Sequence, residues 1–172
     1  DIVPEMSRAW PSWLSQLFNS PIALASITAI LLTLLFRIGI ASHQVIEFEL
    51  ADYPETLAPF MEENGEAWGA RREVVHRILF SLEELMQILA AEKLADSKIK
   101  LDVSFEEFNM EAQVSYTGRA PVFAKNKPTD EEILAEEDAL TRLSGFLIRK
   151  YARKIRIDER DGKCQIRFSF EH

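Results

Sequence analysis

Residues 20–41 read SPIALASITAILLTLLFRIGIA, and this apolar stretch divides the chain into two unlike parts. No charged side chain occurs between Arg8 and Arg37. About 20 apolar residues in a helix cross the roughly 30 Å hydrocarbon layer of a bilayer, and a helix satisfies its own backbone hydrogen bonds there. The stretch therefore predicts one transmembrane helix over 20–41. The alternative is a core helix of a soluble domain, which ordinarily shows a polar face.

The residues before this stretch, 1–19, contain Trp10, Pro11 and Trp13 among apolar neighbours. Aromatic side chains of this kind favour the membrane–water interface, so 1–19 is expected to be an interfacial segment. A loop with a few aromatic residues is the alternative. The chain starts at Asp1 in mid-pattern, so we expect it to be a piece of a longer protein, and it lacks the flanks of a signal peptide.

Charge and cysteine content bound the partners and the compartment. The formal net charge of −8 falls on residues 44–172, because the charged residues of 1–43 cancel. No long basic stripe occurs there, so no nucleic-acid partner is expected. Arg37 lies near the end of the apolar stretch, and Arg71 and Arg72 follow it. The positive-inside rule then predicts an inner or plasma membrane protein with 42–172 in the cytoplasm. Cys164 stands alone, which excludes an intrachain disulfide and fits a reducing compartment.

Beyond residue 41 the spacing of apolar residues alternates between strand and helix periods. The predicted series is a strand at 44–50, a helix from 52–54 to 64–65, a long helix at 70–93, strands at 99–105 and 110–116, a loop or lid at 117–128, a helix at 129–152, and a second hairpin over 155–170 that turns at 161–162. Strands that come in hairpins beside long amphipathic helices favour a two-layer arrangement. The fold class is therefore α+β: one transmembrane helix followed by a two-layer α/β sandwich with a mixed, mostly antiparallel sheet. The predicted domains are 1–19, 20–41 and 42–172.

Residues 10–41, which include WPSWLSQLFNSPIALASITAILLTLLFRIG, resemble the end of a nucleobase permease of the uracil/xanthine type. In that family a short segment with proline and aromatic residues leads into the final membrane helix. The resemblance implies a cytoplasmic tail and a nucleobase substrate that is bound by upstream helices outside this chain.

Residues 44–172 resemble the histidine-kinase-like ATPase fold, nearest to the anti-sigma-factor serine kinases. The order of elements matches, and HRILFSLEELMQIL is the most similar local segment. The resemblance implies that Glu83 activates the attacking hydroxyl, which makes Glu83 the one weak catalytic candidate. Gln87 stands where the family has a magnesium-binding Asn, and its amide is one methylene longer. Gly118 keeps the glycine of the family's Asp-x-Gly, whereas the Asp is replaced by Tyr116.

These departures weaken the nucleotide chemistry that the resemblance implies. Glu83, Gln87 and Gly118 are the candidate cofactor-binding residues for ATP and magnesium, but the glycine-rich lid is missing, since residues 119–133 hold no glycine. A phosphate cradle needs backbone N–H groups at close approach. No metal site is expected, because His76 has no nearby His or Cys partner. A basic cluster at 149–156 complements the end of the helix at 129–152 and could also contact acidic lipid or a partner.

Three functions from different classes follow. The first is the C-terminal portion of a nucleobase transporter whose cytoplasmic domain, of degenerate ATPase fold, is regulatory or sensory and not an enzyme. The alternative is a membrane-tethered, ATP-binding serine kinase of the anti-sigma-factor type. The third is a membrane-anchored adaptor with no small ligand. Expected partners are a lipid membrane and either a second copy of the chain or a cytoplasmic protein.

Overall fold

The computed structural model describes residues 20–37, 42–106, 109–136 and 138–171. The chain divides into two compact units, Asp1–Ile40 and Ala41–His172.

The first unit contains helix α2, Pro21–Arg37. The Ile and Leu side chains from Ile22 to Leu34 are exposed, with Ile22 at 80% and Ile30 at 59%. The hydroxyl of Thr33 donates a hydrogen bond back to the carbonyl of Ala29 (2.7 Å), which satisfies this polar group within the helix.

Of the helix predicted to span a membrane over 20–41, the structure describes Pro21–Arg37 as helix. In the described part of the chain, no helix has both the length and the apolar character to cross a membrane. Residues 38–41 and the predicted interfacial segment 1–19 lie outside the described residues.

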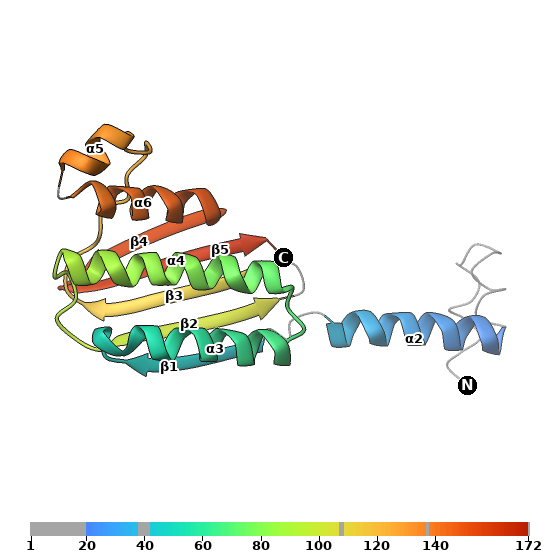
Figure 1. Ribbon diagram of the computed structural model, residues 1–172. Helices are drawn as coiled ribbons and strands as arrows, with labels where there is room; N and C mark the ends of the chain where they lie inside the picture. The colour runs from blue at the N-terminus through green and yellow to red at the C-terminus, as the bar shows by residue number, and fades with distance from the viewer. Residues whose placement is uncertain (1–19, 38–41, 107–108, 137, 172) are drawn as a thin grey trace. The chain divides into compact units, whose positions relative to one another are not determined.

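The second unit is built on a five-stranded sheet with the order β1-β2-β3-β5-β4 (Figure 1). The strands are β1 Ser42–Phe48, β2 Ile99–Glu106, β3 Asn109–Thr117, β4 Lys154–Arg160 and β5 Lys163–Glu171. Every pairing of these strands is antiparallel. The predicted sheet was mixed and mostly antiparallel, and the mixed part of that prediction is wrong. Two helices, α3 (Tyr53–Ala67) and α4 (Arg72–Ala91), connect β1 to β2. The start of β2 lies beside the end of β1, with Phe48 opposite Ile99.

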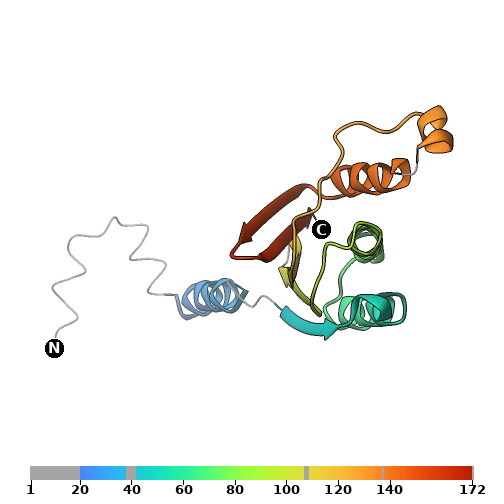
Figure 2. The same ribbon diagram turned by 90° about the vertical axis from the view of Figure 1, so that its left-hand side faces the viewer.

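The helices cover one face of this sheet and leave the other face open (Figure 2). They are α3 Tyr53–Ala67, which follows the short 3-10 turn η2 (Leu50–Asp52), α4 Arg72–Ala91 and α6 Ala139–Tyr151. α4 contacts both α3 and α6, and its apolar stripe from Val74 to Leu89 is buried. Strand residues alternate in burial, so those such as Leu101 and Phe168 enter the core while their neighbours line the open face.

The helix predicted over 129–152 is in fact two helices. α5 spans Asp130–Ala135 and α6 spans Ala139–Tyr151, with Glu136 in an extended conformation between them. Glu132, Glu136 and Asp138 all form ion pairs with Arg142. One continuous helix would crowd the acidic residues of 131–138 together, and the break lets three of them converge on a single guanidinium group.

Candidate functional site

The three residues that the kinase resemblance singles out lie on two different elements. Glu83 and Gln87 lie one turn apart on α4, where Glu83 is half-buried and Gln87 is exposed. Gly118 lies just beyond β3. None of the three lines any of the cavities described below, and their role in binding ATP stays a prediction.

Gly118 has a backbone role in the structure. Its φ is +146°, and a Cβ at this position would lie 1.9 Å from the carbonyl oxygen of Leu94. The N–H of Gly118 donates to the carbonyl of Gly162 (2.8 Å), and the N–H of Arg119 donates to the carbonyl of Leu94 (3.0 Å). The glycine therefore lets the segment after α4, the end of β3 and the β4–β5 turn approach one another closely.

The loop that follows Gly118 is held against the sheet and α6. Phe123 is 7% exposed, and its ring lies 6.4 Å from that of Phe168. Gly145 of α6 makes room for this loop, because a Cβ there would lie 3.0 Å from the backbone nitrogen of Ala124. The hydroxyl of Tyr116 also donates to the carbonyl of Arg119 (2.8 Å). The segment predicted as a loop or lid is thus a packed loop.

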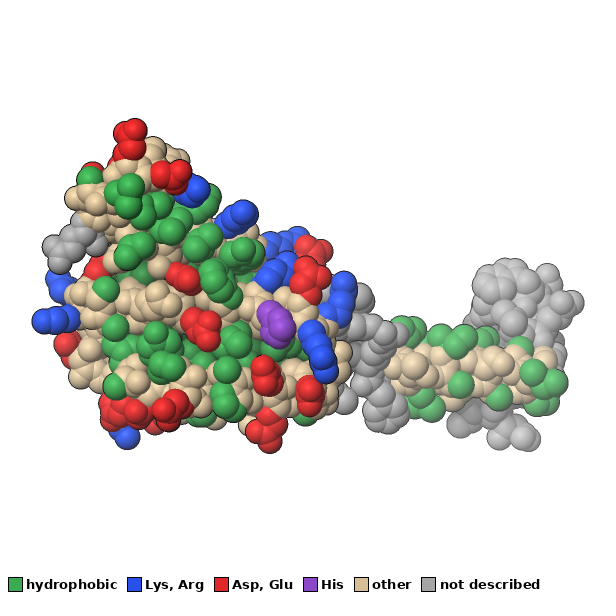
Figure 3. Space-filling view, viewed as in Figure 1, with side chains coloured by type: hydrophobic (Ala, Val, Ile, Leu, Met, Phe, Trp, Pro, Cys, Tyr) green, Lys and Arg blue, Asp and Glu red, His purple; other side chains and the backbone are tan. Residues whose placement is uncertain are grey.

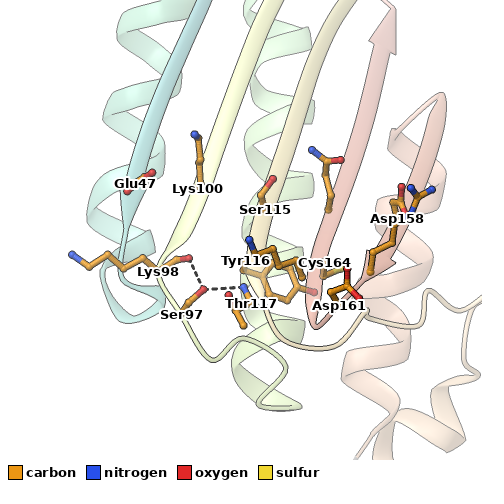
Figure 4. A pocket seen from close by; sticks show the side chains of 13 residues that line it. Glu47, Ser97, Lys98, Lys100, Ser115, Tyr116, Thr117, Asp158, Asp161 and Cys164 are labelled. Carbon is orange, nitrogen blue, oxygen red and sulfur yellow. Dashed lines mark hydrogen bonds and ion pairs between the residues drawn. The ribbon is translucent and has the colours of Figure 1, made fainter.

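A polar cavity of ≈ 720 Å³ lies on the open face of the sheet, near the β4–β5 turn (Figure 4). It crosses all five strands. The residues that line it are Glu47, Ser97, Lys98, Lys100, Ser115, Tyr116, Thr117, Asp158, Arg160, Asp161, Lys163, Cys164 and Gln165. This cavity is the candidate functional site.

The antiparallel register explains how residues so far apart in the sequence meet there. Glu47 lies opposite Lys100, Lys100 opposite Ser115, Ser115 opposite Gln165, and Gln165 opposite Asp158. Directly opposed residues of antiparallel strands share a face. These five side chains therefore form one row across the floor of the cavity.

Ion pairs and backbone contacts occur along the rim of the cavity. Lys98 pairs with Glu49 at 3.5 Å, and Arg160 pairs with Asp158 at 3.0 Å. The Ser97 hydroxyl accepts a hydrogen bond from the N–H of Thr117 (2.9 Å) and donates to the carbonyl of Lys98 (3.0 Å), as Figure 4 shows. Exposed pairs of this kind add little stability, so the cations remain available to a ligand.

Tyr116 and Cys164 border the cavity from the helix side of the sheet, where they lie opposite each other on β3 and β5. Burial raises the pKa of the Tyr116 hydroxyl, and its hydrogen bond with Cys164 raises this pKa further. Burial also raises the pKa of the Cys164 thiol, although the hydrogen bond with Tyr116 acts in the opposite direction. Both groups are therefore protonated near neutral pH and neither is an activated nucleophile.

A second cavity adjoins the first on the same face. Its volume is ≈ 530 Å³, and it is lined by Arg156, Ile157, Asp158, Arg160, Gln165 and Arg167. A third, of ≈ 550 Å³, lies where α3 ends and α4 begins, with His76, Glu62 and Glu66 in its lining. No group of three or more His, Cys, Asp or Glu side chains is placed to hold a metal ion among the described residues.

The open-face site was not found from the sequence alone. The predicted basic cluster at 149–156 is divided by the structure, since Arg149 and Lys150 lie on α6 whereas Lys154 and Arg156 lie on β4. The cations of the cavities come from the start of β2 and from β4 and β5, and strand alternation alone could have assigned them to one face. Only the strand order shows that they are neighbours.

On the helix side of the same unit, apolar side chains lie along and between the helices, with acidic and basic side chains and a histidine among them (Figure 3).

Comparisons with known proteins do not identify a family for this chain. No family model matches the chain, and no curated protein matches it. Among solved structures, the Acinetobacter baumannii histidine kinase AdeS is similar to this chain, with a TM-score of 0.40 and 12% sequence identity. The match covers 93% of this chain and 82% of that one. This likeness is weak and carries no argument about the fold or the activity of this chain.

Proposed function

We propose that residues 41–172 form a regulatory domain that binds a polar ligand on the open face of its sheet and does not hydrolyse ATP. The observation that supports this most is the ≈ 720 Å³ cavity, which lies on that face and not around Glu83, Gln87 and Gly118. Its lining combines cations, carboxylates and hydroxyls, a set suited to binding a charged ligand.

The chemistry of the lining favours binding over catalysis. The nucleophile candidates, Tyr116 and Cys164, are held in their protonated forms by burial. Glu83, the residue that the kinase resemblance would make a general base, lies on α4 in the helix layer and outside the cavity. A catalytic base must lie within hydrogen-bond reach of the proton it removes.

A phosphate-release assay tests the absence of ATP hydrolysis. The full chain is incubated with Mg-ATP beside its Glu83→Gln variant. We expect both proteins to release phosphate at the rate of the buffer alone. Release by the natural chain that is lost in Glu83→Gln would instead show ATP hydrolysis that depends on Glu83. Kinase activity and nucleobase transport rest on the sequence resemblances alone.

A lipid contact is a second proposal, and exposed apolar side chains on α2 favour it. Ile30 and Leu31 are each 59% exposed, and burying such side chains in a lipid phase is favourable. The predicted membrane location, with residues 42–172 in the cytoplasm, and the predicted protein partner or homo-oligomer stay proposals beside it.

Vesicle sedimentation tests the lipid contact. We expect the full chain to sediment with phosphatidylcholine vesicles and the Ile30→Asp/Leu31→Asp variant to remain in solution. Val122→Asp is the matched control, because Val122 is also an exposed apolar residue (81%) but lies in the second unit. Equal sedimentation of all three proteins would show that α2 does not make the contact.

A further inference from the structure

The β4–β5 hairpin places like charges directly opposite each other on the open face. Arg156 is the partner of Arg167, and Arg160 is the partner of Lys163. Both pairs lie on the open side, because the alternating residues, such as Ile166 and Phe168, are buried on the helix side. Like charges in directly opposed positions destabilise a sheet. Two such pairs on one hairpin therefore require an explanation.

The chain's own groups neutralise these charges only in part. Asp158 lies between the two pairs and forms an ion pair with Arg160 (3.0 Å). The Gln113 side-chain oxygen accepts hydrogen bonds from Arg167 at 2.7 and 3.1 Å, which orients the guanidinium without cancelling its charge. In the described part of the chain, Arg156 and Lys163 form no ion pair. An excess of positive charge remains on this hairpin in a chain of net charge −8.

The two cation pairs open into the two adjoining cavities. Arg160 and Lys163 line the ≈ 720 Å³ cavity, Arg156 and Arg167 line the ≈ 530 Å³ cavity, and the two share Asp158, Arg160 and Gln165. Lys163 and Arg167 are four residues apart on β5, which places their Cα atoms roughly 13 Å from each other. Long Arg and Lys side chains can converge on a shorter ligand, so the site fits two or more anionic groups on one molecule.

The cations and neutral donors of the lining favour a phosphate-type ligand, although Glu47 and Asp161 also line the first cavity. Paired Arg side chains bind phosphate oxygens in a bidentate manner, and the hydroxyls of Ser115 and Thr117 add neutral donors at the first cavity. The one aromatic residue in either lining is Tyr116, whose ring is buried on the helix side. Without an exposed ring there is no platform on which nucleobases could stack.

We propose that the open face of the β4–β5 hairpin binds a ligand that carries a chain of phosphate groups, each end held by one cross-strand cation pair. This inference rests on the proposed function and names the class of its ligand. The shared chemistry is the phosphate chain, which either an inorganic polyphosphate or a nucleoside polyphosphate could supply. Local electrostatic repulsion that persists in the free protein is typical of binding sites.

Titration calorimetry of the full chain with inorganic tripolyphosphate tests the proposal. The Arg156→Gln/Arg167→Gln variant removes one cation pair. The control, Arg149→Gln/Lys150→Gln, removes the same charge from α6, where neither residue forms an ion pair within the described residues. We expect affinity to fall roughly tenfold or more in the hairpin variant, since charge-assisted hydrogen bonds are lost, and to change less than about twofold in the control.

Thermal unfolding in low salt distinguishes a loss of the binding site from a loss of the fold. Because repulsion is relieved, the hairpin variant should unfold at the same or a higher temperature than the natural chain when no ligand is present, but tripolyphosphate should no longer raise its Tm. A hairpin variant that unfolds at a much lower temperature, or equal loss of affinity in both variants, would overturn the site.

Three further ligands identify the chemistry. If ATP and tripolyphosphate bind with equal affinity, the protein recognises the phosphate chain alone. Tighter binding of ATP would indicate an additional contact with the base and would identify the ligand as a nucleoside polyphosphate. Citrate that binds as well as tripolyphosphate, or single-stranded DNA that binds more tightly, would overturn the phosphate-chain proposal. These two outcomes would leave the proposed function standing. The proposed function is tested separately, and it fails if the chain hydrolyses ATP in a way that depends on Glu83.

Discussion

At the scale of single residues, Gly118 shows how a position that resembles part of a nucleotide site can serve the fold instead. A Cβ on Gly118 would lie 1.9 Å from the Leu94 carbonyl oxygen. We expect Gly118→Ala to lower the free energy of unfolding by about 3 kcal/mol or more, because backbone must move and φ is unfavourable. Urea denaturation measures this.

Gly162→Ala is the matched control for that substitution. Gly162 also has a positive φ of +71°, but nothing lies within 4 Å of a Cβ there. Strain in φ alone should cost about 1 to 2 kcal/mol. Equal losses for the two variants would contradict the close approach of Gly118 to Leu94.

Cys164 is the second residue with a distinct expectation. It is 1% exposed, and burial raises its pKa, so little thiolate forms near neutral pH. We expect a thiol reagent to label the native chain far more slowly than the chain in urea, with labelling accelerating at alkaline pH. Rapid native labelling at pH 7 would show that this side of the cavity opens readily.

At the scale of elements, the capping box of α5 gives a pH-dependent contribution to stability. The N–H of Thr129 donates to the Glu132 carboxylate (2.6 Å), and this bond lowers the pKa of Glu132. A lowered native pKa means that the contribution is fully present above the unfolded pKa and is lost as the pH falls through the native value. Carboxyl NMR titration should show a lowered midpoint for Glu132. In Thr129→Pro, which removes this N–H at a φ of −73° that proline can adopt, the midpoint should move upward; an unchanged midpoint would contradict the assigned cause.

The break between α5 and α6 depends on Arg142. Three carboxylates form ion pairs with its guanidinium group. Because Arg142→Met removes these pairs, it should speed amide hydrogen exchange at residues 130–136 and 138. The loss of stability should be about 1 kcal/mol or less, because the pairs are partly exposed. Arg149→Met is the control, and an equal effect there would argue against the Arg142 cluster.

Most elements could be predicted from the sequence because burial on one face leaves a clear period. The strands β2 and β3 and the helix α4 show it plainly, and the 161–162 turn follows from an Asp-Gly pair between strands. The break at 136–138 could not be predicted in this way, since it depends on ion pairs with Arg142.

At the scale of the whole sheet domain, the candidate site depends on strand order. Arg156 and Arg167 are eleven positions apart, and Lys100 is far from both; their common face follows from the register of three pairings. Local resemblance directed attention to Glu83 and Gln87 on the helix side. Cations scattered over several strands carry no local signature, so the open-face site required the fold.

The most direct test is to map where Mg-ATP, which carries a phosphate chain, perturbs the backbone amide NMR spectrum of the full chain. We predict shifts centred on β4 and β5 around Lys163 and Arg167, which persist when magnesium is removed. Shifts centred on Glu83 and Gln87 that require magnesium would contradict the account and restore the kinase-type site.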